Sequence, residues 1–303
     1  MMTTASLTRE WTVPQGRHSA RRQLRIRSLI TWALSGLAIL LVALALAFLA
    51  TGGRWFIVQT PSMGEVAPVG TLILDAPTTA QHVAVGDIVT FHPPTNPSQV
   101  YTHRVVSIAA DGALSTKGDV NGAIDPWSLS DKDLIGKTFA VLPVFGWVIR
   151  AVPFVAAGFV VSWLLSFAFR SPSARSAVRV IGLSVTTAVT AFVLHPFVGV
   201  VVETSRLTAK GAEATLVSTG ILPITVSAVG GGHVSLASGQ LGKLSIPTMA
   251  VNGHYALSSA LDLPLIGWIV FGLVCSTPLL WCLIVGLPPK TESVDEAEGI
   301  AAQ

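Results

Sequence analysis

The sequence LAILLVALALAFLA (residues 37–50) is followed shortly afterwards by QTPSMGEVAPVGTLIL (residues 59–74). The first stretch ends an uncharged run that begins at Ser28. That run exceeds the roughly 20 residues that a helix needs to cross a bilayer. It also exceeds the apolar region of a cleaved signal peptide, which is about 7–15 residues long. We therefore expect residues 28–50 to remain as a membrane anchor, and cleavage after Ala47 is the competing interpretation.

The composition indicates that much of this chain lies in lipid. Of 303 residues, 51% are hydrophobic and only 12% are charged, whereas a soluble domain is about 25% charged. These values exclude an ordinary soluble enzyme and an intrinsically disordered chain, and two cysteines are too few for a disulfide-stapled scaffold. Six arginines precede residue 28. Because lipid-length sequence follows at once, they predict a cytoplasmic arm and not a nucleic-acid-binding segment.

Three further apolar stretches are long enough to span a membrane. The link RSPSARSAVR (residues 170–179) contains three arginines and no acidic residue, so the positive-inside rule places it in the cytoplasm with the N-terminal arm. We therefore predict a multi-pass cell-membrane protein with both termini inside. The predicted organisation is a cytoplasmic arm (1–27), transmembrane helix 1 (28–50), a mostly β extracytoplasmic domain (51–150), helix 2 (151–169), a cytoplasmic loop (170–179), helix 3 (180–202), a second small β-rich outside module (203–263), helix 4 (264–287) and a cytoplasmic tail (288–303).

The outside segment 51–150 carries the side chains best suited to catalysis. Ser62 follows the first span by about a dozen residues, and a serine hydroxyl needs an adjacent base to become a good nucleophile. The imidazole of His103 is a base of the kind that can accept that proton, while a carboxylate from Asp119 or Asp125 can orient the imidazole. A serine, a histidine and an aspartate occur together by chance in a hundred residues, so the residue types alone predict no site.

The order and surroundings of these residues are more informative. The short motifs are Ser62-Met63 with Pro68-Val69-Gly70, VGDIVTF (85–91), THRVV (102–106), KGD (117–119) with Asp125-Pro126, IGK (135–137) and PVFGW (143–147). Over residues 57–148 this order resembles the type I signal peptidases. Histidine in the THRVV motif, where the common bacterial branch has lysine, resembles the serine–histidine branch found in archaea, the endoplasmic reticulum and some Gram-positive bacteria.

The resemblance implies a β-rich peptidase domain and a membrane-bound serine endopeptidase that removes signal peptides from exported precursors after small residues. Ser62 would be the nucleophile and His103 the general base. Asp125 would orient His103, with Asp119 as the alternative. The implied partners are the signal peptides of exported precursors and the lipid bilayer, with the active site on the outer face. No nucleic acid, cofactor or metal is expected, and the sequence leaves the oligomeric state open.

One position departs from the family pattern. The family usually has proline three residues after the nucleophile, and this sequence has Glu65. The departure favours an alternative function, a catalytically weak peptidase-like membrane assembly or binding protein whose working part would be residues 203–263. His195, followed by Pro196 inside the third predicted span, is expected to be a neutral imidazole bonded between helices at a kink.

Overall fold

The computed structural model describes residues 16–209, 211–247 and 256–276. The chain forms two compact units, residues 1–53 and 54–303, which are described separately. In the first, helix α1 (Gly16–Ala50) contains a candidate membrane span, Trp32–Ala50. The helix ends because Gly52 adopts a positive φ of 84°, which lets the N–H groups of Gly52 and Gly53 donate to the carbonyl oxygens of Leu49 and Phe48. This Schellman arrangement satisfies the last carbonyl groups of the helix.

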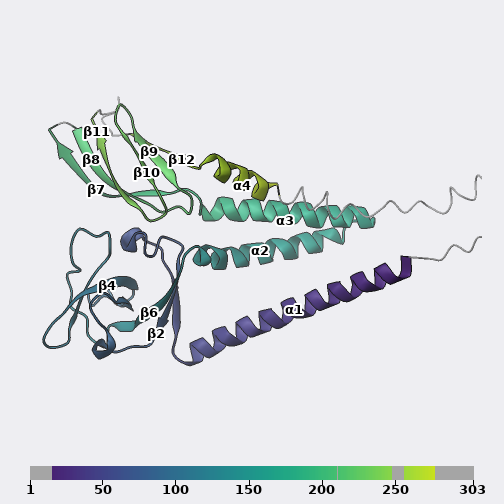
Figure 1. The fold of residues 1–303 in the computed structure, drawn as a ribbon, viewed down its shortest axis with the longest axis horizontal. Helices are drawn as coiled ribbons and strands as arrows, with labels where there is room; N and C mark the ends of the chain where they lie inside the picture. Colours follow the sequence, from purple (N-terminus) through teal and green to yellow (C-terminus); the bar gives the residue numbers. More distant parts are fainter. Residues whose placement is uncertain (1–15, 210, 248–255, 277–303) are drawn as a thin grey trace, which may run out of the picture. The chain divides into compact units, whose positions relative to one another are not determined.

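The second unit begins with a six-stranded antiparallel sheet (Figure 1), and residues 54–142 are called the sheet domain below. Its strands, in the order in which they pair, are β1 (Arg54–Ile57), β2 (Leu72–Ala76), β6 (Leu134–Leu142), β3 (Ile88–Phe91), β4 (Tyr101–Ile108) and β5 (Leu114–Lys117). One buried hydrophobic cluster of this domain includes the fully buried residues Val89, Phe91, Val105 and Leu114. They alternate with more exposed residues on β4 and β5, as a sheet with one buried face requires.

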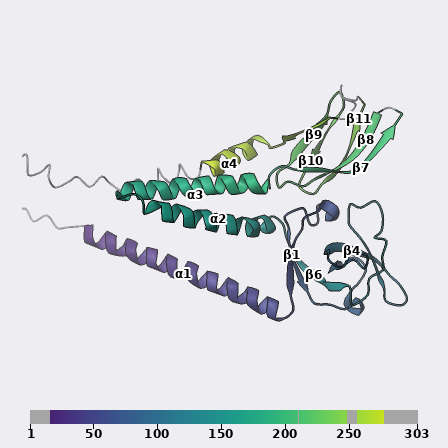
Figure 2. The same cartoon turned by 180° about the vertical axis from the view of Figure 1, so that it is seen from behind.

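Two long helices, α2 (Phe145–Ser166) and α3 (Pro172–Leu194), lie side by side in both views (Figures 1 and 2). Small residues allow this close approach. A Cβ atom at Gly158 would collide with Thr186, and one at Gly182 would collide with Ser162. Small residues at helix contacts are typical of membrane helix pairs, where packing replaces the hydrophobic effect as the driving force. Both helices are long and apolar enough to cross a membrane.

The limits of these helices differ from the predicted spans. Helix α2 begins at Phe145, before residue 151, and α3 begins at Pro172, inside the link expected to be a cytoplasmic loop. Ser171 explains the early start of α3, because its Oγ accepts a hydrogen bond from the N–H of Ala174 as an N-cap. Proline at the next position suits the first helical turn.

Helix α3 also ends earlier than expected, at Leu194. His195 adopts a left-handed conformation, with φ 47° and ψ 45°, as residues that end a helix often do. Pro196 disfavours a right-handed helical conformation of His195 and so opposes continuation of the helix. His195 therefore caps the helix and does not lie within the span. Strand β7 (Val200–Thr208) occupies the last residues of the third predicted span.

Within the described residues, three helices meet the length and composition of a membrane span. The fourth predicted span, 264–287, is represented by α4 (Leu265–Cys275), and its remainder from residue 277 lies outside the described residues. So do the first 15 residues of the N-terminal arm and the whole predicted tail, 288–303. A mostly β domain accompanied by apolar helices is confirmed.

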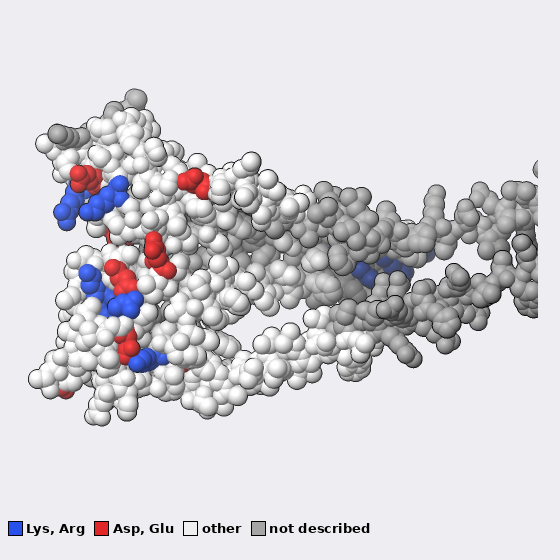
Figure 3. All heavy atoms as spheres, in the orientation of Figure 1, with Lys and Arg blue, Asp and Glu red and all other residues white. Residues whose placement is uncertain are grey.

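The described residues between 200 and 261 form a second strand-rich region, called the sandwich module below. One of its three-stranded antiparallel sheets has the order β11 (Leu241–Ile246), β8 (Gly211–Ser218), β7, and the other has the order β10 (His233–Leu236), β9 (Ile224–Ala228), β12 (Leu257–Leu261). Alternate residues of both sheets meet in one core that includes Leu216, Ile224, Val226 and Leu244. Figure 3 shows many of the visible charged side chains over the strand-rich regions.

Candidate active site

Ser62 lies in a short loop, residues 60–65, which is called the Ser62 loop below. Thr60 and Pro61 start a single 3-10 turn (η1, Pro61–Met63), and the turn ends at Gly64, whose φ of 54° and ψ of −135° suit a residue without a side chain. Met63 is buried in a cluster with Ala67 and Ile73. The neighbouring Met63 therefore anchors the loop in the core while the Ser62 side chain stays partly exposed.

His103 comes from β4, where residues alternate between the two faces of the sheet. His103 and Val105 are buried, and Arg104 between them points to the other face. The rings of Phe91 and Tyr101 lie 6.1 and 5.7 Å from the imidazole, measured between centroids. These aromatic contacts restrict the orientation of the imidazole.

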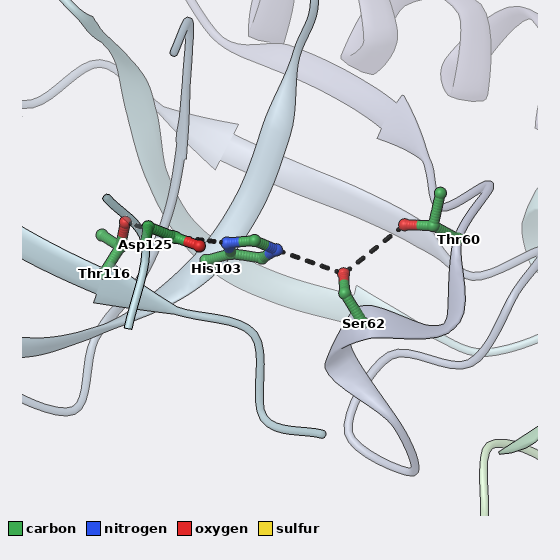
Figure 4. A network of polar contacts seen from close by, with 5 residues as sticks. All are labelled: Thr60, Ser62, His103, Thr116 and Asp125. Carbon is green, nitrogen blue, oxygen red and sulfur yellow. Dashed lines mark hydrogen bonds and ion pairs between the residues drawn. The ribbon is translucent and has the colours of Figure 1, made fainter. Parts of the chain in front are cut away.

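The imidazole joins Ser62 to Asp125 (Figure 4). His103 Nδ1 lies 2.7 Å from Asp125 Oδ2, and His103 Nε2 lies 3.2 Å from Ser62 Oγ. An ionised carboxylate can only accept hydrogen bonds, so in this arrangement Nδ1 keeps its proton and donates a hydrogen bond to Asp125. The free lone pair of Nε2 then faces the serine hydroxyl, which is the tautomer that a general base requires.

Asp125 follows β5 in a turn-rich segment and is held there by Thr116. The Thr116 hydroxyl donates to Asp125 Oδ2 at 2.7 Å, and the N–H of Asp125 donates to the carbonyl oxygen of Thr116 at 2.9 Å. Both side chains of the His103–Asp125 pair are less than a tenth exposed. Oδ2 therefore accepts two hydrogen bonds in a nearly dry setting, which restricts its position relative to the imidazole.

Asp119, the alternative partner of His103, is engaged elsewhere. Arg104 donates to both of its carboxylate oxygens, from Nε at 2.8 Å and from Nη2 at 2.7 Å. These hydrogen bonds to Asp119 raise the pKa of Arg104 above its ordinary value. The strand alternation thus sends Arg104 and Asp119 to one side and His103 with Asp125 to the other.

A groove of about 650 Å³ opens beside Ser62. One wall is β1 with residues 58–60, and the other is residues 99–102, which include the first two residues of β4. Strand β1 is an edge of the six-stranded sheet, so one side of its backbone does not pair with another strand of that sheet. Arg150 is the charged residue of the groove lining, and the polar Gln59 and Gln99 also line the groove. The guanidinium carbon of Arg150 lies 5.4 Å from the centre of the Trp147 ring.

Two threonines at the site were not identified from the sequence. Thr60 Oγ1 lies 3.4 Å from Ser62 Oγ, and Thr116 binds Asp125 (Figure 4). The position of Thr60 two residues before Ser62 could have indicated this contact. The side chain of an extended residue before a turn can point toward that of the second turn residue, here Ser62. Thr116 offered no such signal, since its contact with Asp125 depends on how the chain returns after β5.

Among the residues that the structure describes, no group of three or more His, Cys, Asp or Glu side chains is placed to hold a metal ion. At the candidate site, His103 joins the hydroxyl of Ser62 to the carboxylate of Asp125 by two contacts. Such an arrangement can take a proton from a hydroxyl and return it to a leaving group.

Residues 29–120 match the model of the family described as signal peptidase, peptidase S26. The match confirms the predicted resemblance to type I signal peptidases over these residues. It begins within α1, includes Ser62 and His103, and ends before Asp125. Neither the curated proteins nor the solved structures include a match to the chain.

Proposed function

We propose that this chain, with its match to the signal peptidase family over residues 29–120, is a membrane-bound serine endopeptidase of the serine–histidine type. Its substrates are exported precursor proteins, and it removes their signal peptides after small residues. The family match and the apolar helices indicate association with a membrane. The proposed topology is multi-pass with both termini in the cytoplasm and the active site on the outer face.

The observation that carries the proposal is the hydrogen-bonded series Ser62–His103–Asp125 beside a groove. Nucleophile and base are within hydrogen-bond reach, and a third group orients the base, which is the general requirement for an activated nucleophile. The Ser62–His103 distance of 3.2 Å is at the long end of such contacts, and these bonds often tighten only when substrate is bound.

In the proposed reaction, Ser62 Oγ attacks the carbonyl carbon of the scissile peptide while its proton passes to His103 Nε2. The C–N bond then breaks as His103 gives that proton to the departing amine, leaving an ester on Ser62. Water attacks the ester and loses a proton to His103. The ester bond breaks, and the proton returns to Ser62 Oγ. Asp125 stabilises the imidazolium in both halves of the reaction.

The negative charge on the carbonyl oxygen needs donors close to Ser62. The candidates are the backbone N–H of Ser62 and the hydroxyl of Thr60, which lies 3.4 Å from Ser62 Oγ. Loss of one such donor costs about 100- to 1000-fold in rate in comparable enzymes. Thr60 is therefore proposed as a donor to the oxyanion.

The groove supports recognition of an extended peptide. A substrate strand can pair with the open edge of β1 and place its side chains in pockets between β1 and residues 99–102. The small residues at the end of a signal peptide emerge at the membrane surface, and Ser62 follows the end of α1 by about a dozen residues. A nucleophile next to an anchor suits that substrate.

The experiment is cleavage of a model exported precursor by the detergent-purified full chain, with mass spectrometry of both products. We expect one cut after a small residue, absent in Ser62→Ala and in His103→Ala. Matched controls are Ser235→Ala in the sandwich module and His82→Ala in the sheet domain, which should retain cleavage.

Cleavage that persists in Ser62→Ala would overturn the assigned nucleophile. No cleavage by the folded wild-type protein would favour the alternative assembly or binding function, for which residues 203–263 would be the working part.

A further inference from the structure

The sandwich module touches the Ser62 loop directly, through the turn between β10 and β11. A Cβ atom built at Gly239 would lie 2.9 Å from the backbone nitrogen of Glu65 and 2.7 Å from the carbonyl carbon of Gly64. Real Cβ atoms do not approach backbone atoms so closely. Gly239 and Gly64 are both buried, so the two backbones pack against each other with no room for a side chain.

Hydrogen bonds within the turn that contains Gly239, and between that turn and the end of β8, stabilise its conformation. The N–H of Gly239 donates to the carbonyl oxygen of Ser218 at 3.0 Å, and the N–H of Ser218 donates to the carbonyl oxygen of Gln240 at 3.1 Å. The N–H of Ala237 donates to Gln240 Oε1 at 2.8 Å. Ser218 ends strand β8, whose Leu216 and Val217 are fully buried in the module. The turn is therefore tied to the core of the sandwich module.

The Ser62 loop is held from another direction by the segment after β5. The N–H of Val120 donates to the carbonyl oxygen of Ser62 at 3.0 Å. A Cβ atom at Gly64 would lie 2.6 Å from the Val120 side chain and 3.4 Å from the carbonyl oxygen of Gly239. The loop thus has one neighbour in the sheet domain and a second in the sandwich module.

We propose that the Gly239 turn is a positioning element, which keeps the Ser62 loop where Ser62 Oγ can reach His103 Nε2. The proposal rests on the proposed function and gives the sandwich module a part in it. A displacement of about 1 Å at a reacting group can cost roughly 100-fold in rate, so a rigid contact on the two residues after Met63 has a direct effect on the 3.2 Å Ser62–His103 distance.

The test substitutes Gly239→Ala in the full chain. The added methyl group must push the Ser62 loop away, and the left-handed φ of 74° adds backbone strain. Gly112→Ala is the matched control, because its φ of 85° carries similar strain with nothing within 4 Å of the added atom. We expect kcat for precursor cleavage to fall roughly 10- to 100-fold in Gly239→Ala. KM should change much less, because β1, Val58, Gln59 and residues 99–102 supply most of the groove lining and Thr60, Ser62 and Met63 of the loop supply the smaller part. The control should stay within twofold of wild type.

A second variant, Gln240→Ala, removes the acceptor for the Ala237 N–H and loosens the turn without adding an atom near the loop. It should lower kcat severalfold at unchanged KM. It keeps the proposal testable if Gly239→Ala fails to fold. Equal kcat values in wild type, in Gln240→Ala and, if it folds, in Gly239→Ala would overturn the proposal. A loss of activity that is explained entirely by a lower melting temperature of the variant would also overturn it.

Hydrogen exchange provides a readout that does not depend on activity. The amides of residues 62–65 should exchange faster in Gly239→Ala than in wild type or Gly112→Ala, and unchanged exchange would contradict the positioning role. If the wild-type chain cleaves no precursor, the proposed function fails, and the exchange comparison still decides whether the turn restrains the Ser62 loop.

Discussion

The sheet domain and the sandwich module are both built from antiparallel strands, yet they bury different side chains. The sheet domain buries Asp75, Thr90, His103 and Thr116, whereas the described core of the sandwich module is aliphatic, with Ser218 as its buried polar residue. Burying polar groups costs free energy unless they are hydrogen-bonded. A domain that keeps a connected set of them is suited to chemistry, and a domain that replaces them with Leu, Ile and Val is suited to packing.

The largest expected effect compares two aspartates that each accept a hydrogen bond from a threonine. Thr116 donates to Asp125 in the sheet domain, and Thr225 of the sandwich module donates to Asp262, the residue that follows β12. Asp125→Asn should lower kcat about 1000- to 10,000-fold, because the amide favours the wrong imidazole tautomer. Asp262→Asn should leave the cleavage rate within twofold, so a comparable loss in both variants would erase the contrast between the two regions.

The next effect compares hydroxyl groups. Thr60→Val keeps the shape of the side chain and removes the candidate oxyanion donor, so kcat should fall about 100-fold with KM little changed. Thr225→Val in the sandwich module should have no effect on kcat. A Thr60→Val enzyme with wild-type kcat would mean that other donors stabilise the oxyanion, and steady-state kinetics distinguish the two results.

A smaller effect concerns stability and its dependence on pH. Burial raises the pKa of Asp75, although the hydrogen bond that its Oδ1 accepts from Thr138 opposes the rise. Its Oδ2 has no hydrogen-bond partner among the described residues. The folded state therefore holds this proton to higher pH than the unfolded state, and Asp75 makes folding less favourable as pH rises through the raised pKa.

Asp75→Asn removes that charge. We expect its midpoint of thermal unfolding to exceed that of wild type at pH 7.5. The difference should shrink as the pH falls toward 4, because the raised pKa makes folded wild-type Asp75 take up its proton at higher pH than the unfolded chain does. Glu213→Gln on an exposed position of β8 is the control and should show no pH-dependent gain. A gain for Asp75→Asn that is the same at both pH values would contradict the assignment.

The smallest effect concerns a surface ion pair. Lys137 Nζ lies 2.6 Å from Asp87 Oδ2, with side chains 38% and 23% exposed. Burial raises the pKa of Asp87, but the hydrogen bonds from Lys137 and from the N–H of Ala84, together with the charge of Lys137, lower it below its ordinary value. Lys137→Met should cost about 0–1 kcal/mol of unfolding free energy and leave cleavage unchanged, as should Lys243→Met on β11. If chemical denaturation shows that Lys137→Met loses more than about 2 kcal/mol of unfolding free energy, the Lys137–Asp87 ion pair has a structural role that this prediction excludes.

The first apolar helix and the neighbouring positions of Ser62 and His103 could be predicted because their signals are local. Hydropathy marks residues 28–50, and short motifs surround Ser62 and His103. The choice between Asp119 and Asp125 was not local. It depends on the alternation of β4, which sends Arg104 to Asp119 and leaves His103 to face Asp125.

Other features could not be read from composition. The third helix begins with the Ser171 cap inside a basic link and ends before Pro196, whereas a hydropathy window follows only the apolar residues. The contact between Gly239 and the Ser62 loop joins segments far apart in the sequence. Nothing in either segment alone predicts it, because it arises from how the sandwich module returns to the sheet domain.

The most direct test of the central claim is covalent labelling of the purified full chain with a fluorophosphonate, followed by mass spectrometry of the modified peptide. Such reagents react with a serine only when a neighbouring base activates it. We predict one adduct, on Ser62, that is lost in His103→Ala and strongly slowed in Asp125→Asn. Labelling of a different serine, or labelling of Ser62 at the same rate in His103→Ala, would contradict the account.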